Sequence, residues 1–171
     1  MKINSKLIAF FKKHNLYDEK AFSYIEEHST MLDSNFPDEM MLRTCAYQID
    51  SRTNVLKGIH VNVPYVKDEK TMLDNIHELT HAIFAYKKIG KKFKKDITIE
   101  TLPLLYERLY LLENPSEELK VYTKYLDSLV TQDDKAYMFA LQVREELLNS
   151  YDANPQKIVR RLKKISRKYH C

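Results

Sequence analysis

The longest regular hydrophobic pattern in the chain lies between residues 68 and 90. Apolar residues recur there at alternating spacings of four and three, the pattern of a buried stripe along an α-helix. They are Met72, Ile76, Leu79, Ile83 and Tyr86, and the stripe is widened by Leu73, Phe84 and Ala85. We therefore predict a long helix that is buried most of the way round. Asp68 or its neighbour is suited to cap its start and Gly90 to end it.

Apolar patterns of helical period predict six further helices. They lie at about residues 5–14, 18–31, 97–113, 116–130, 133–151 and 155–169. Pro103 falls in the first turn of the third of these, where a proline is well tolerated. The chain contains only 2 glycines and 5 prolines, which favours long helices over a fold built on many tight turns.

Two segments between the helices alternate between apolar and polar residues instead. Residues 42–49 alternate loosely, and residues 59–66 alternate strictly, with Ile59, Val61 and Val63 on one side. Residues 51–54 suit a turn, so the two segments predict an antiparallel hairpin. Pro64 points to a strand end or an exposed edge. We therefore predict an α+β fold that is predominantly helical, with a small antiparallel β-hairpin ahead of the long helix.

Composition is that of an ordinary globular chain. Among 171 residues, 44% are hydrophobic and 30% are charged, the net charge is +4, and no tract is long enough to cross a membrane. The N-terminus lacks the pattern of a signal peptide, and Cys45 and Cys171 form no disulfide framework or four-sulfur site. We therefore expect a cytoplasmic protein with one domain over residues 1–171. Its parts are N-terminal helices (1–40), a hairpin (41–66), a helix pair (67–113) and C-terminal helices (114–171).

The long helix carries His77 and His81 one turn apart, with Glu78 directly after the first histidine. On a helix both imidazoles can reach one metal ion, whereas Glu78 lies about 100° round the turn. That position suits a base acting on a metal-bound water better than a third ligand. Two neutral imidazoles, an open metal position and a carboxylate base are the groups needed to hydrolyse an amide bond.

A catalytic zinc site usually has three protein ligands and a water. Glu100, 19 residues after His81, is the candidate for the third, because that distance lets the first helix end and a second bring a carboxylate back. Asp96 is a nearer rival in a lysine-rich segment, and His60 on the predicted strand is another.

Residues 77–82 and 100–107 together resemble the zincin metallopeptidases whose third ligand is a glutamate, the gluzincins. Within them the chain is most similar to the thimet oligopeptidase and oligoendopeptidase F family, although it is much shorter. The resemblance implies a zincin-like catalytic domain with one Zn²⁺ ion held by His77, His81 and Glu100. It also implies that Glu78 is the general base.

The resemblance further implies roles for two residues outside the zinc motif. Glu107, seven residues after Glu100, would be a carboxylate that supports the ligands, although a salt bridge with Arg108 or a lysine explains it as well. Tyr137 would hold the oxyanion, as tyrosines on a later helix do in the family. The alternative for Tyr137 is a place in the core, since the chain contains 12 tyrosines.

These patterns predict a zinc metallopeptidase acting on a peptide or protein substrate. The strand with Ile59, His60 and Val61 would pair with an extended peptide. The alternative is a catalytically silent metal-containing regulatory or binding module that contacts anionic partners. Nucleic acid is not favoured as a partner, because docking of a terminal helix accounts for most of the basic residues after position 156.

Overall fold

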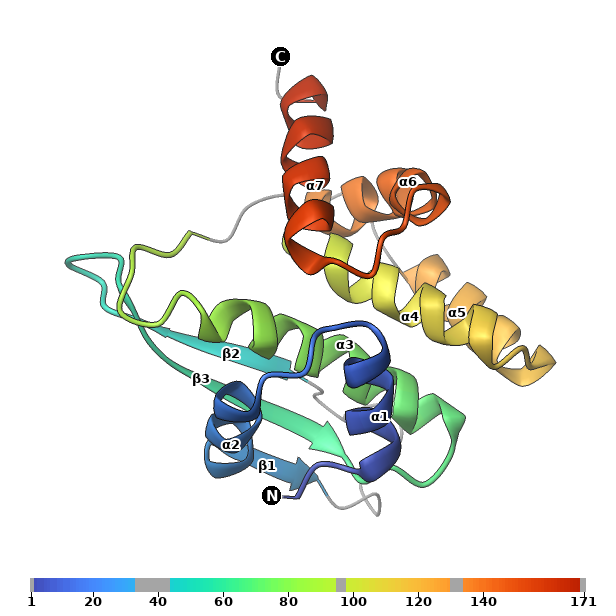
Figure 1. Ribbon diagram of the computed structural model, residues 1–171, viewed down its shortest axis with the longest axis horizontal. Helices are drawn as coiled ribbons and strands as arrows, with labels where there is room; N and C mark the ends of the chain where they lie inside the picture. Colours follow the sequence, from blue (N-terminus) through green and yellow to red (C-terminus); the bar gives the residue numbers. More distant parts are fainter. Residues whose placement is uncertain (1, 33–43, 95–97, 130–133, 170–171) are drawn as a thin grey trace.

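The computed structural model describes residues 2–32, 44–94, 98–129 and 134–169 (Figure 1). Within them the chain is predominantly helical, with a small mixed β-sheet. The helices are α1 (Ser5–Lys13), α2 (Glu19–Glu27), α3 (Glu69–Tyr86), α4 (Thr101–Glu113), α5 (Glu117–Leu129), α6 (Lys135–Asn149) and α7 (Pro155–Tyr169). The strands are β1 (Ser29–Leu32), β2 (Thr44–Ile49) and β3 (Leu56–Pro64).

Each of the seven predicted helices is present, with different ends. The long helix ends at Tyr86 instead of at Gly90, and α4 begins at Thr101. Gly90 lies in the turn that follows α3, with a φ of 79°, a left-handed conformation that favours glycine. Its N–H donates to the Leu56 carbonyl at 2.8 Å, so this turn is tied to the start of β3. The predicted ends at residues 42, 97, 130 and 133 lie outside the described residues.

The sheet has the order β1-β3-β2. β2 pairs with β3 in antiparallel fashion, as expected of the hairpin, but β1 adds to the other side of β3 in parallel. The prediction of a helix as far as residue 31 is wrong, because α2 ends at Glu27 and Ser29 pairs with Val61. Pairing with a distant strand has overridden the local helical pattern there.

Of the two positions that Pro64 suggested, the strand end is correct, because β3 ends at Pro64, whereas the exposed edge is wrong. Residues 61–64 pair with β1 and residues 56–62 pair with β2, so the strand is central. Residue 59 of β3 precedes the part that pairs with β1, and its N–H donates to the Tyr24 hydroxyl at 3.2 Å. The backbone of Ile59, His60 and Val61 is therefore occupied and cannot take up a peptide.

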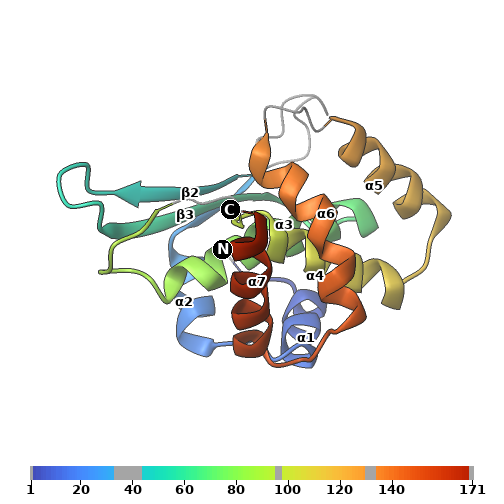
Figure 2. The same cartoon turned by 90° about the horizontal axis from the view of Figure 1, so that it is seen from above.

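Helix α3 lies between the sheet and α4, and α6 and α7 lie beyond α4 (Figures 1 and 2). Asp68 and Thr71 form a capping box at the start of α3. Every residue from position 71 to position 83 is buried, as the wide apolar stripe predicts.

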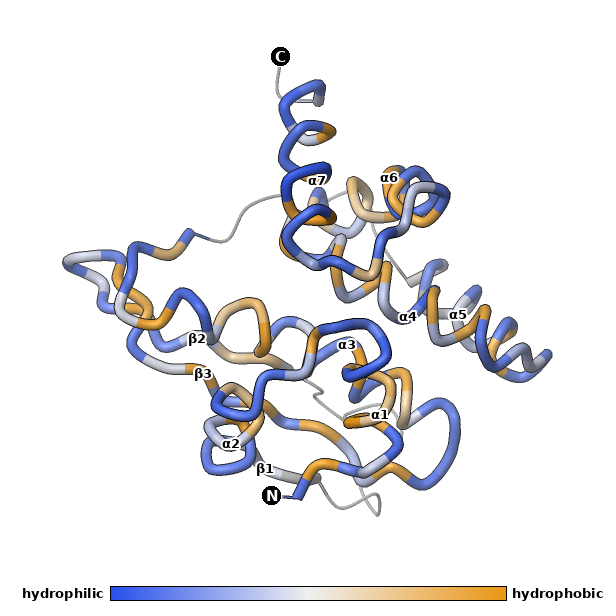
Figure 3. Tube along the Cα trace, in the orientation of Figure 1, coloured by the Kyte–Doolittle hydropathy of each residue, from blue (hydrophilic) through white to orange (hydrophobic). Residues whose placement is uncertain are grey.

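Helix α7 is different: it is hydrophilic along most of its length (Figure 3) and buries only one stripe, formed by Ile158, Leu162 and Ile165. In the described part of the chain, none of the helices combines the length and the apolar character needed to span a membrane.

Candidate metal site

The two histidines lie in the middle of α3, where the helix is covered on both sides. His77 is 5% exposed, Glu78 7% and His81 8%. Burying three ionisable groups is costly unless each is paired or binds a cation. Nearby, the Thr80 hydroxyl is satisfied locally, since it donates to the Ile76 carbonyl at 2.6 Å. The partners of the histidines come instead from α4.

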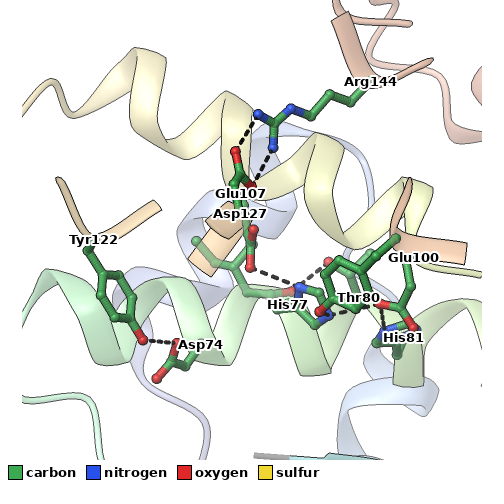
Figure 4. Close-up of polar contacts among 11 residues, drawn as sticks. Asp74, His77, Thr80, His81, Glu100, Glu107, Tyr122, Asp127 and Arg144 are labelled. Carbon is green, nitrogen blue, oxygen red and sulfur yellow. Dashed lines mark hydrogen bonds and ion pairs between the residues drawn. The ribbon is translucent and has the colours of Figure 1, made fainter. Parts of the chain in front are cut away.

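Glu100 brings a carboxylate to both histidines from the start of α4. Its Oε2 lies 3.2 Å from Nε2 of His77 and 3.1 Å from Nε2 of His81. Figure 4 shows the three side chains pointing toward one another. Glu100 occupies the N-cap position of α4 but makes no side-chain cap hydrogen bond. Its carboxylate is therefore directed at the histidines and leaves its own helix end uncapped.

These three residues form a group that could hold a metal ion, with one ligand atom of each within 4.8 Å of the others. Tetrahedral zinc with bonds of about 2.0–2.1 Å keeps its ligand atoms about 3.3 Å apart. The two nitrogen–oxygen distances, 3.1 and 3.2 Å, are close to that spacing. Two imidazoles and one carboxylate are also the donor set of one class of catalytic zinc site. The group could therefore hold a metal ion.

The electrostatics of the group favour a cation at its centre. Burial by itself would lower the pKa of His77, but the carboxylates of Glu107 and Glu100 raise that pKa to about 10. Burial would likewise raise the pKa of Glu100, but hydrogen bonds from His77 and His81 lower it to about 2. A divalent cation and a proton on His77 Nε2 therefore compete for the same point between the three side chains.

Glu107 contacts the other nitrogen of His77. It lies two turns further along α4, is 6% exposed, and its Oε1 accepts a hydrogen bond from Nδ1 of His77 at 2.8 Å (Figure 4). With the proton on Nδ1, the neutral imidazole presents the lone pair of Nε2 toward Glu100 and His81. A carboxylate in this position orients a histidine ligand and increases its basicity.

A cavity of about 180 Å³ opens beside the group and is shared by Glu78 and Tyr137. The hydroxyl of Tyr137, on α6, lies 3.3 Å from Nε2 of His77. The structure therefore brings His77, Glu78, His81, Glu100 and Tyr137 to one cavity, with Glu107 behind it.

Strand β2 forms a wall of this cavity that the sequence did not reveal, through Thr44, Cys45 and Tyr47. Burial, then the neighbouring Cys45, raises the pKa of Tyr47, so its phenol stays protonated at neutral pH. Only the loose alternation of residues 42–49 marked the strand, and nothing in that pattern pointed to the metal site.

The rival ligand His60 and the expected substrate strand do not contribute to the group. His60 Nε2 lies 3.2 Å from the Thr30 hydroxyl and 3.1 Å from Asn62 Oδ1, at the sheet. Asp96 lies outside the described residues. Ile59 and Val61 face the core, with 3% and 1% exposure.

Comparison of the chain with protein-family models, with curated proteins and with solved structures found no match in any of the three. The similarity to gluzincins thus remains a prediction from two short motifs. What the described residues show is a buried His77–His81–Glu100 group that could hold a metal ion.

Proposed function

We propose that the protein is a zinc-dependent peptidase. The observation that carries this proposal is the convergence of His77, His81 and Glu100 on one point beside a cavity that Glu78 also lines. A bound zinc ion would supply Lewis acidity that lowers the pKa of a water and polarises a carbonyl. A purely structural site has no need of a carboxylate base at the same cavity.

Glu78 is the proposed general base. This residue lines the cavity but is not part of the ligand group. It would accept a proton from the attacking water and pass it to the nitrogen of the leaving amine. The Tyr137 hydroxyl would donate a hydrogen bond to the carbonyl oxygen as that oxygen becomes negative.

Strand β2, in place of β3, is the proposed guide for the substrate. One side of β2 pairs with β3, and within the described ranges no strand pairs with its other side. Thr44, Cys45 and Tyr47 of this strand line the metal cavity. An extended peptide that pairs with β2 would therefore pass the group of ligands with its backbone held in register.

Metal analysis and two substitutions test the proposal. The purified protein should contain one equivalent of zinc, and His81→Ala should lose it. Glu78→Gln should keep the metal while peptide cleavage falls by at least about 10²-fold, since it cannot act as a base. An unchanged rate would remove Glu78 from this role. A zinc-loaded wild type that cleaves nothing in a mixed peptide library would instead identify a silent metal module.

Tyr137→Phe tests the oxyanion role separately. Loss of one donor of this kind lowers kcat by about 10²–10³-fold, and the zinc content should not change. The readout is single-turnover cleavage, together with metal content in the same samples. Unchanged kcat would place Tyr137 among residues that only pack.

A further inference from the structure

A second cavity of about 190 Å³ adjoins the metal cavity, between α3, α4 and α7. The two cavities share Tyr47, His81 and Ile99 in their walls. One of the proposed ligands, His81, therefore lines both cavities. For comparison, an apolar cavity of about 150 Å³ holds a benzene molecule, so the second cavity has room for a phenylalanine or leucine side chain.

The wall of this cavity is largely apolar and is assembled from distant parts of the chain. It is formed by Phe84, Phe93, Leu102, Pro103, Val159 and Leu162. The ring centres of Phe93 and Tyr47 are 4.9 Å apart, and the ring centres of Tyr47 and His81 are 6.5 Å apart. The ring of Tyr47 thus lies between Phe93 of the apolar cavity and His81 of the metal group.

Three lysines contribute the charge around this apolar wall. Lys88, Lys94 and Lys163 line the cavity and are exposed. Lys88 Nζ lies 5.2 Å from the centre of the Phe93 ring. None of the described residues that line the cavity is acidic. A ligand with an apolar group and an adjacent anion therefore matches both the wall and its charged surroundings.

We propose that this cavity is a specificity subsite for a large apolar substrate side chain next to a carboxylate. The proposal rests on the peptidase function, because it places that residue beside the bond to be cleaved. The carboxylate can come from the end of a peptide chain or from a following aspartate or glutamate. Both sources present the same chemistry to the lysines.

Binding to the zinc-loaded Glu78→Gln protein tests the subsite without turnover. Short peptides would be titrated by calorimetry, with phenylalanine or alanine at the subsite position. Replacing phenylalanine by alanine should weaken binding by about 10–100-fold, as expected for loss of a buried aromatic side chain. Equal binding of the two peptides would overturn the proposal.

Three versions of the phenylalanine peptide separate the sources of the carboxylate. One ends in a free acid, one in an amide, and one carries an aspartate before the amide. One of the two anionic peptides, or both, should bind about 3–10-fold more tightly than the neutral amide, and salt should reduce the difference. Equal affinity of all three peptides would show that the lysines do not bind the carboxylate.

Two neighbouring lysines on α7 provide a matched pair of variants. Lys163 lines the cavity, whereas Lys164 lines a different one between α6 and α7, and both are exposed. Lys163→Gln should remove part of the preference for the anionic peptide, and Lys164→Gln should not. Equal effects of the two variants would contradict the assignment of Lys163.

Failure of the subsite is distinguishable from failure of the peptidase function. If Glu78→Gln shows the expected peptide preferences but the wild type cleaves no peptide, the subsite stands and the peptidase function fails. If the wild type cleaves phenylalanine and alanine peptides at equal rates, the function stands and the subsite is wrong.

Discussion

Of the three histidines that are buried among the described residues, His77 and His14 both contact carboxylates from α4, but their surroundings differ. His77 meets Glu100 and Glu107, from the start and middle of α4, whereas His14 meets Glu113 at the end of that helix. Each also contacts a tyrosine: Tyr137 at 3.3 Å for His77, and Tyr151 at 2.6 Å for His14. By burial alone they would be indistinguishable, with exposures of 5% and 3%.

The two histidines differ in the number of carboxylates that face the ring and in whether a carboxylate oxygen is shared with a second histidine. Two carboxylates raise the pKa of His77 against its burial. For His14 burial dominates and lowers the pKa, with Glu113 offsetting only part of the effect. The Oε2 of Glu100 is also shared with a second histidine, His81. Around His77, one oxygen of Glu100 contacts two imidazoles, an arrangement expected of metal ligands. Around His14, the contacts with Tyr151 and Glu113 instead hold α1 against α4 and the segment after α6.

The largest effect that separates the two histidines is on metal affinity. Glu107→Gln should weaken zinc binding by about 10–100-fold, because the amide can still accept a hydrogen bond from His77 but no longer carries the charge. Glu113→Gln makes the same change beside His14 and should leave zinc affinity as it is. Competition with a chromophoric chelator measures both. Equal affinities of the two variants would show that Glu107 is only a structural partner.

A smaller effect is expected on folding stability. Tyr151→Phe leaves Nδ1 of His14 without its hydrogen-bond partner, in a ring whose centre lies 4.6 Å from the centre of the Phe10 ring. The free energy of unfolding should fall by about 1–2 kcal/mol, while zinc content stays constant. Urea denaturation with metal analysis of the same sample measures both quantities. Loss of zinc from Tyr151→Phe would show that the surroundings of His14 also affect the metal group, and would contradict the distinction between the two histidines.

The residues of the metal group could be predicted because their relations are local. His77 and His81 are four residues apart on one helix, and Glu100 and Glu107 are seven apart on the segment that returns to it. Helical geometry alone then places each pair on one face. The prediction further required only that the connection between the two helices let the histidine face meet the glutamate face.

The sheet order and the second histidine environment could not be predicted because they depend on distant partners. The position of β3 depends on its pairing with β1, where Ser29 meets Val61. The hydrogen bond between His14 and Tyr151 joins residues 137 positions apart. A pattern of period two or 3.6 carries information on which face is buried, and none on which remote segment covers it.

The smallest effect expected is a pH dependence that belongs to His14. The groups around it are Tyr151, Tyr106, Glu113 and Lys13. Burial first, and Lys13 in addition, hold the pKa of His14 below its ordinary value of 6.5, against the opposing effect of Glu113. The unfolded chain therefore takes up a proton more readily than the folded protein as the pH falls below about 6.5.

The stability that neutral His14 contributes should thus be complete above about pH 6.5 and decline as the pH falls below it. Urea denaturation of wild type and His14→Gln at about pH 7.5 and about pH 5.5 isolates this contribution, since other titrating groups are common to both proteins. The advantage of the wild type should be smaller at the lower pH. An advantage that grows on acidification would mean that the pair with Glu113 outweighs burial, and the two histidines would then differ only in their number of carboxylates.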